Sequence, residues 1–122
     1  MTAVRVLVVE DDPPIARLLA RTARMEGAEV TLVGDGLDAR HEWERGSFAL
    51  VLLDAMLPGI DGLTLCRERR LAGDRTPVVL LTARHLAEIG DLAREAEVDE
   101  ILAKPFAYEE LVALLRRYLH GA

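Results

Sequence analysis

The chain has 122 residues, of which 51% are hydrophobic and 30% are charged, a composition that suits a single globular domain spanning residues 1–122. A formal net charge of −6 argues against nucleic-acid binding by this domain, and no apolar run approaches the roughly 20 residues that a membrane span needs. The single cysteine, Cys66, excludes an internal disulfide and fits a reducing compartment, so we expect a cytoplasmic protein.

Four short apolar runs and one alternating run, residues 29–33, are separated by segments whose apolar residues recur at helical spacing. The first run, VRVLVV, is rich in β-branched residues, and the run that ends at Asp54 shows no polar alternation, as is typical of strands buried on both faces. Pro13-Pro14 opens the first helix and Gly27 closes it. The predicted strands are residues 4–9, 29–33, 49–54, 77–82 and 100–103, and the predicted helices are residues 13–26, 37–45, 62–71, 86–96 and 108–119.

This alternation predicts an α/β fold, in which a doubly wound parallel sheet has helices on both faces. Crossover connections in such sheets are right-handed, so the carboxyl ends of all strands lie along the same edge. Ligands bind at that edge, in the crevice where the strand order reverses.

Polar side chains stand at the ends of four predicted strands. Glu10 and Asp11 follow the first strand, while Asp54 ends the third. Thr82 ends the fourth strand and Lys104 follows the fifth. Lys104 is the only lysine among 15 basic residues, a departure from the arginine used everywhere else. We therefore expect carboxylates, one hydroxyl and one ammonium group at one rim of the sheet.

These groups predict a site that binds a magnesium ion and a phosphoryl group. Clustered carboxylates repel one another, and a hard divalent cation relieves the repulsion. Oxygen ligands select Mg²⁺ or Mn²⁺ over zinc, and no cysteine or histidine is placed to bind a softer metal. A phosphoryl group would satisfy both Lys104 and Thr82, and a carboxylate can itself accept phosphoryl to give an aspartyl-phosphate.

Four motifs at these strand ends carry a resemblance to a known family. VVEDD ends the first strand, LLDAMLPGIDG surrounds the third, LLTA lies on the fourth and KPF follows the fifth. With these motifs in this order, the whole chain resembles a response-regulator receiver domain of two-component signalling. The resemblance implies a flavodoxin-like sheet of five strands in the order 2-1-3-4-5 with five helices. It also implies a cis peptide bond between Lys104 and Pro105.

The resemblance implies a role for each site residue. Asp54 would be the phosphoacceptor, charged by the phosphohistidine of a sensor histidine kinase or a phosphotransfer protein. Mg²⁺ would be bound by Asp11, by Asp54 and by the backbone carbonyl of Met56, with Glu10 acting through a water molecule. Thr82 and Lys104 would contact the phosphoryl group. The backbone amides of Ala55 and Ala83 would complete the set of groups that bind it.

A domain of this family would be a phospho-switch that assists its own phosphorylation and dephosphorylation, rather than an enzyme acting on a separate substrate. Its output face would be formed by the fourth helix, the fifth strand and the fifth helix, a face that could also form a homodimer. A C-terminal effector domain, absent from this chain, could receive the signal. We expect no membrane partner and no direct contact with nucleic acid.

Two positions depart from the family pattern and keep an alternative open. Ile101 stands where the family usually has Tyr or Phe, so we expect phosphorylation to be read out weakly or differently. Glu97 stands where the family tends to have glycine, which predicts a different ending for the fourth helix. The alternative hypothesis to a phosphoacceptor domain is therefore a pseudo-receiver that acts as a phosphorylation-independent protein-interaction module. A flavodoxin would need a Ser/Thr/Gly phosphate loop after the first strand, and an aspartate phosphatase would need an acid at Met56.

Overall fold

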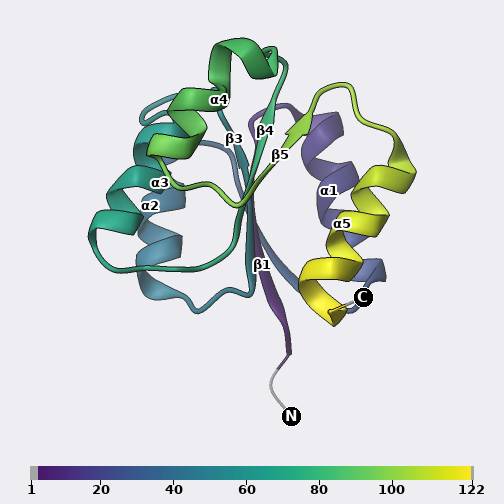
Figure 1. Cartoon of the computed structure of the whole chain (residues 1–122). Coiled ribbons are helices and arrows are strands. Elements are labelled where there is room, and N and C mark those ends of the chain that lie inside the picture. The colour runs from purple at the N-terminus through teal and green to yellow at the C-terminus, as the bar shows by residue number, and fades with distance from the viewer. Residues whose placement is uncertain (1–2, 122) are drawn as a thin grey trace.

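Strands and helices alternate along the whole chain (Figure 1). The computed structural model describes residues 3–121, apart from the side chain of Leu86. All ten predicted elements are present, and their bounds differ from the predicted ones by at most one residue. The strands are β1 (Arg5–Val9), β2 (Glu29–Val33), β3 (Leu50–Asp54), β4 (Val78–Thr82) and β5 (Glu100–Ala103), and the helices are α1 (Pro13–Met25), α2 (Gly36–Arg45), α3 (Gly62–Leu71), α4 (Leu86–Glu95) and α5 (Tyr108–His120).

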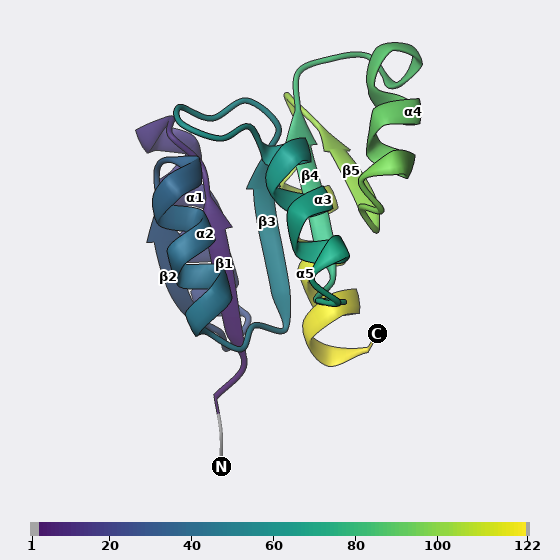
Figure 2. The same ribbon diagram turned by 90° about the vertical axis from the view of Figure 1, so that its left-hand side faces the viewer.

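The five strands form one parallel sheet in the order β2-β1-β3-β4-β5, as predicted (Figure 2). The strand order reverses next to β1, so β1 and β3 are neighbours although β2 lies between them in the sequence. Pairing of Asp54 with Leu81, and of Thr82 with Ala103, brings the carboxyl ends of β3, β4 and β5 to the same level. This edge is where the sequence places the polar side chains.

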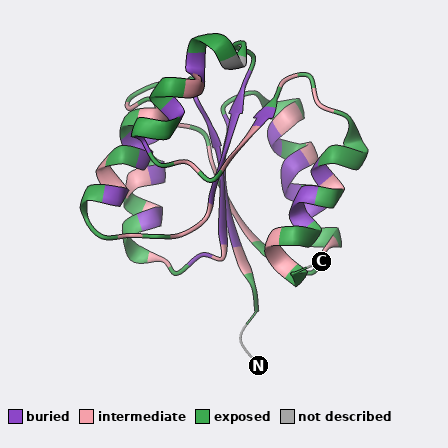
Figure 3. Cartoon of the chain, in the orientation of Figure 1, coloured by how far each residue is buried: buried purple, intermediate pink, exposed green. Residues whose placement is uncertain are grey.

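Helices cover both faces of the sheet. Figure 1 shows α1 and α5 on one side, and α2, α3 and α4 on the other. Each face therefore has its own apolar layer, and the central strands between them are buried (Figure 3). The layer beneath α1 and α5 includes Leu19, Ala23, Leu111, Leu114 and Leu115, and the layer beneath α2, α3 and α4 includes Ala39, Trp43, Leu65, Cys66, Ile89 and Ala93.

Within residues 3–121, no helix is both long enough and apolar enough to cross a bilayer.

The end of α4 differs from its expected form. Glu97 has a φ of 59°, so α4 closes through a left-handed residue although that residue is not glycine. The amide of Val98 donates to the carbonyl of Ala93 and the amide of Glu97 donates to that of Arg94, which is the bonding that a glycine-closed helix uses. The expectation of a different ending was wrong, because Arg70 donates a hydrogen bond to the backbone carbonyl of Glu97 and holds this conformation.

Candidate functional site

The carboxyl ends of β1, β3, β4 and β5 meet along one edge of the sheet and carry the predicted polar groups. Glu10 directly follows β1, Asp54 and Thr82 are the last residues of β3 and β4, and Lys104 directly follows β5. Parallel pairing aligns these ends, so Lys104 contacts Glu10 although 94 positions separate them. The peptide bond between Lys104 and Pro105 is cis, as the sequence motif implied.

The ammonium group of Lys104 lies between two carboxylates. Its Nζ donates to Oε1 of Glu10 at 2.6 Å and to Oδ2 of Asp54 at 3.2 Å. Both acids are buried, so water screens these ion pairs poorly. Burial by itself would lower the pKa of Lys104, but the hydrogen bond to Glu10 and the charge of Asp54 outweigh it and raise that pKa. The lysine is therefore a fixed positive charge at the centre of the site.

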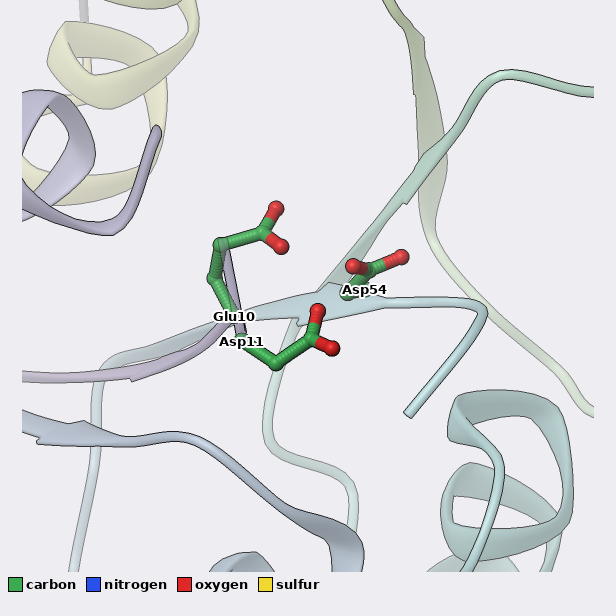
Figure 4. Close-up of side chains that lie close together, drawn as sticks. All are labelled: Glu10, Asp11 and Asp54. Atoms are coloured by element: carbon green, nitrogen blue, oxygen red, sulfur yellow. The ribbon is translucent and has the colours of Figure 1, made fainter. Parts of the chain in front are cut away.

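Three carboxylates face a common space (Figure 4). One oxygen atom each from Glu10, Asp11 and Asp54 lies within 4.8 Å of the others. Burial, together with the nearby carboxylate of Asp54, raises the pKa of Glu10 to about 7. The three carboxylates still carry more negative charge than the one ammonium group of Lys104 neutralises. An all-oxygen ligand set with this surplus of charge fits a hard divalent cation such as Mg²⁺.

The loop after β3 places the amide of Met56 against the phosphoacceptor candidate. The Met56 amide donates to Oδ1 of Asp54 at 3.0 Å. The Ala55 amide instead donates to the carbonyl of Leu81 at 2.9 Å, because Ala55 continues the pairing of β3 with β4. In this structure the Ala55 amide is thus bonded within the sheet, whereas the Met56 amide is directed at Asp54. The expected contact of the Ala55 amide with a phosphoryl group stays a prediction.

Thr82 is the last residue of β4 and is buried. Its Oγ1 accepts a hydrogen bond from the amide of Arg84 at 3.0 Å, which leaves the hydroxyl proton available for a further acceptor. Ala83 follows directly and is exposed. A groove of about 460 Å³ is lined by Ala55, Met56 and Arg84, among other residues, so this side of the site opens to the surface.

One support of the site was not predicted from the sequence. Gly62, the first residue of α3, lies so close to the end of β3 that a Cβ atom there would be 2.1 Å from the carbonyl oxygen of Asp54. Its amide donates to the carbonyl of Ala55 at 3.0 Å, which closes the loop between β3 and α3. Asp61 caps α3, and an Asp-Gly pair before a helix is typical of an ordinary turn and cap, so no local pattern indicates this close approach.

Ile101 lies at the middle of β5, away from the acidic cluster. It is half-buried and packs against the apolar layer beneath α2, α3 and α4. The residue pairs with Leu80 on β4, two positions before Thr82. An aliphatic side chain at this position can contribute packing, but it has no aromatic ring and no hydroxyl to present at the α4–β5–α5 surface.

Comparison with known proteins agrees with this geometry. Residues 6–116 match the family model of the response regulator receiver domain. The chain therefore belongs to the response regulator receiver domain family, and it is the receiver domain of a two-component response regulator.

The transcriptional regulatory protein TcrA of Mycobacterium tuberculosis is 42% identical over 116 residues, which cover 95% of this chain and 46% of TcrA. The chain thus spans about half the length of the curated relatives that it matches.

Two solved structures illustrate the structural likeness. The response regulator DrrB of Thermotoga maritima, described as an OmpR/PhoB homologue, superposes with a TM-score of 0.88 at 30% identity, covering 98% of this chain and 54% of DrrB. The receiver domain of the sensor histidine kinase PA1611 of Pseudomonas aeruginosa PAO1 superposes with a TM-score of 0.86 at 35% identity, covering 99% and 100% of the two chains. The PA1611 structure has a magnesium ion coordinated in its active-site cleft.

Proposed function

We propose that this domain accepts a phosphoryl group on Asp54 from the phosphohistidine of a sensor histidine kinase or a phosphotransfer protein. The observation that carries the proposal is the position of Lys104. From the end of β5, its ammonium group bridges Glu10 after β1 and Asp54 at the end of β3. A purely structural ion pair would not need a second buried acid, nor the neighbouring carboxylate of Asp11.

In this reaction a carboxylate oxygen of Asp54 attacks the phosphorus atom, a new P–O bond forms, and the P–N bond to the imidazole breaks. Lys104 would neutralise charge on the transferring group, and the hydroxyl of Thr82 would donate to one of its oxygens. The backbone amides of Met56 and Ala83 would donate to the others. Glu10 would keep the ammonium of Lys104 oriented.

Asp11 and Asp54 would hold Mg²⁺ directly, with the carbonyl of Met56 as a further ligand and Glu10 acting through a water molecule. The bound ion would supply positive charge that offsets the carboxylates and the phosphoryl oxygens. The all-oxygen donor set of the site supports this choice of metal.

The output would be a shift between two packings of the α4–β5–α5 face, favoured by new contacts of the phosphoryl group with Thr82 and Lys104. The domain would thus act as a cytoplasmic switch that assists its own phosphorylation and dephosphorylation. A homodimer through that face and a C-terminal effector domain are the further partners that we propose. The name of TcrA, a transcriptional regulatory protein of about twice this length, supports an effector.

Incubation with acetyl phosphate and Mg²⁺, followed by mass spectrometry, tests the proposal. We expect the mass of one phosphoryl group to be added at Asp54, and no addition when EDTA replaces Mg²⁺. Asp54→Asn is the matched control and should not gain mass. If the wild-type chain is unchanged at saturating acetyl phosphate, the alternative of a pseudo-receiver, which Ile101 leaves open, is the better interpretation.

A further inference from the structure

The loop of residues 55–61 lies against the N-terminal end of α2 (Figure 2). The carboxylates, the hydroxyl and the ammonium group of the site all come from strand ends, and none comes from α2. The amide of Gly36 donates to the carbonyl of Pro58 at 2.9 Å. A Cβ atom on Gly36 would lie 2.1 Å from the carbonyl oxygen of Ile60 and 2.7 Å from its nitrogen. These are backbone atoms that cannot rotate away, so any side chain at position 36 must displace the loop or the helix.

The conformation of α2 does not itself require glycine at this position. Gly36 is the first helical residue, and its φ lies outside the left-handed range, so other residues could adopt its backbone conformation. The helix end is fixed separately, because the carboxylate of Asp35 accepts the amide of Asp38 at 2.8 Å. The absence of a side chain at Gly36 therefore serves the close approach of the loop.

The loop is short and held at both ends, so a displacement at Pro58 or Ile60 reaches the site. Its far end is closed by Gly62, whose amide bonds to the carbonyl of Ala55. Its near end carries Met56, whose amide bonds to Asp54. Moving the middle of such a loop changes the position of the Met56 backbone relative to the carboxylate of Asp54.

We propose that Gly36 is a positioning residue for the metal and phosphoryl site, acting through the loop of residues 55–61. This inference rests on the proposed function, because it assumes that the Met56 backbone contributes to that site. Gly36 would not touch the metal or the phosphoryl group. It would set the affinity for Mg²⁺ by keeping the loop in the position that places Met56 against Asp54.

Gly36→Ala tests the proposal, with Gly46→Ala as the matched control at the opposite end of the same helix. A Cβ on Gly46 would lie 2.6 Å from the ring of Phe48, so this variant is also crowded, but it does not touch the loop. The dissociation constant for Mg²⁺ is measured by NMR titration of the Met56 amide, and the free energy of unfolding by urea denaturation. We expect Gly36→Ala to bind Mg²⁺ about 10-fold more weakly than the wild type, as is typical when a supporting contact of a metal ligand is lost.

The outcomes separate this inference from the proposed function. Wild-type affinity for Mg²⁺ in Gly36→Ala overturns the role of Gly36, and so does an equal loss of affinity in Gly46→Ala. Failure of the wild type itself to bind Mg²⁺ or to accept phosphoryl overturns the proposed function instead.

A second measurement uses the wild type alone and remains decisive if Gly36→Ala does not fold. Because coupling between two contacts is reciprocal, Mg²⁺ should slow hydrogen exchange of the Gly36 amide, which bonds to Pro58. The Gly46 amide, which bonds to Glu42 within α2, should be unaffected. Unchanged exchange at Gly36 in saturating Mg²⁺ contradicts the proposal.

Discussion

The guanidinium group of Arg70 donates from Nε to the backbone carbonyl of Glu97 at 3.0 Å, and so anchors the left-handed residue that ends α4. The Arg70 side chain is only 4% exposed. It also donates to the carbonyls of Asp74 and Thr76 and to Oδ2 of Asp99. One arginine in α3 therefore holds the loop before β4 and the junction between α4 and β5 in place.

Replacing Arg70 with methionine should strongly destabilise the domain. The methionine keeps most of the buried apolar stem, but three backbone carbonyls lose the guanidinium donor. The Asp99 carboxylate also loses it and keeps the amide of Val78. We expect the free energy of unfolding to fall by about 3 kcal/mol, as measured by urea denaturation. Arg67→Met, at an exposed position of the same helix, should change it by less than about 0.5 kcal/mol. Equal effects of the two substitutions would show that the Arg70 bonds contribute little.

Replacing Glu97 with glycine should stabilise the domain. A residue with a Cβ atom at a φ of 59° is strained, and glycine removes that strain. The left-handed conformation costs a residue with a Cβ atom roughly 1–2 kcal/mol, and the greater entropy of glycine in the unfolded chain offsets part of the gain. We therefore expect the free energy of unfolding to rise by about 1 kcal/mol. Glu97→Ala, which loses the same exposed ion pair with Arg75 but keeps the Cβ atom, should give no gain. Equal stabilities of the glycine and alanine variants would contradict the strain at this position.

The stability of the metal-free domain should depend on pH through Glu10. Burial and the nearby carboxylate of Asp54 raise the pKa of Glu10 from 4.5 to about 7, so the folded state binds this proton more tightly than the unfolded state. The resulting stabilisation is complete below pH 4.5 and is lost as the pH rises through about 7. Urea denaturation in EDTA at pH 5 and pH 8 should show a smaller loss of stability in Glu10→Gln than in the wild type. Glu95→Gln, at an exposed position of α4, should keep the wild-type difference between the two pH values.

Installing tyrosine at position 101 should strengthen the response to phosphorylation. Ile101 packs against the apolar layer but has no aromatic ring to present at the α4–β5–α5 face. We expect both chains to bind beryllofluoride, and Ile101→Tyr to show the greater self-association on binding, as measured by sedimentation velocity. The Asp54→Asn, Ile101→Tyr double variant should show no such increase. If the wild type already associates as strongly as Ile101→Tyr, the aliphatic residue is no handicap to the output.

Much of the fold and the acidic site could be predicted because each depends on a local pattern. Apolar runs that end in Asp54, Thr82 or Lys104 mark strand ends, and parallel topology then brings those ends together. The hydrogen bond from the Ala55 amide to the carbonyl of Leu81 could not be predicted, because it depends on how far the pairing of β3 with β4 continues.

The contacts that hold the site and the end of α4 in place join segments that are far apart in the sequence. No local sequence pattern predicts such contacts. Arg70 belongs to a run of basic residues in α3 that is typical of a solvated helix face, yet it is buried by the loops around it. Gly36 has the sequence of an ordinary turn and cap, and its contact with Ile60 arises only from the packing of α2 on the loop after β3.

Asp54, Thr82 and Lys104 should together receive one phosphoryl group, and a crystal structure of the domain grown with Mg²⁺ and beryllofluoride tests this. We expect a beryllofluoride group bonded to the carboxylate of Asp54, with Nζ of Lys104 and Oγ1 of Thr82 within hydrogen-bonding distance of its fluorine atoms. Crystals that hold the ligands elsewhere, or an adduct on Asp54 that neither Lys104 nor Thr82 contacts, would contradict it.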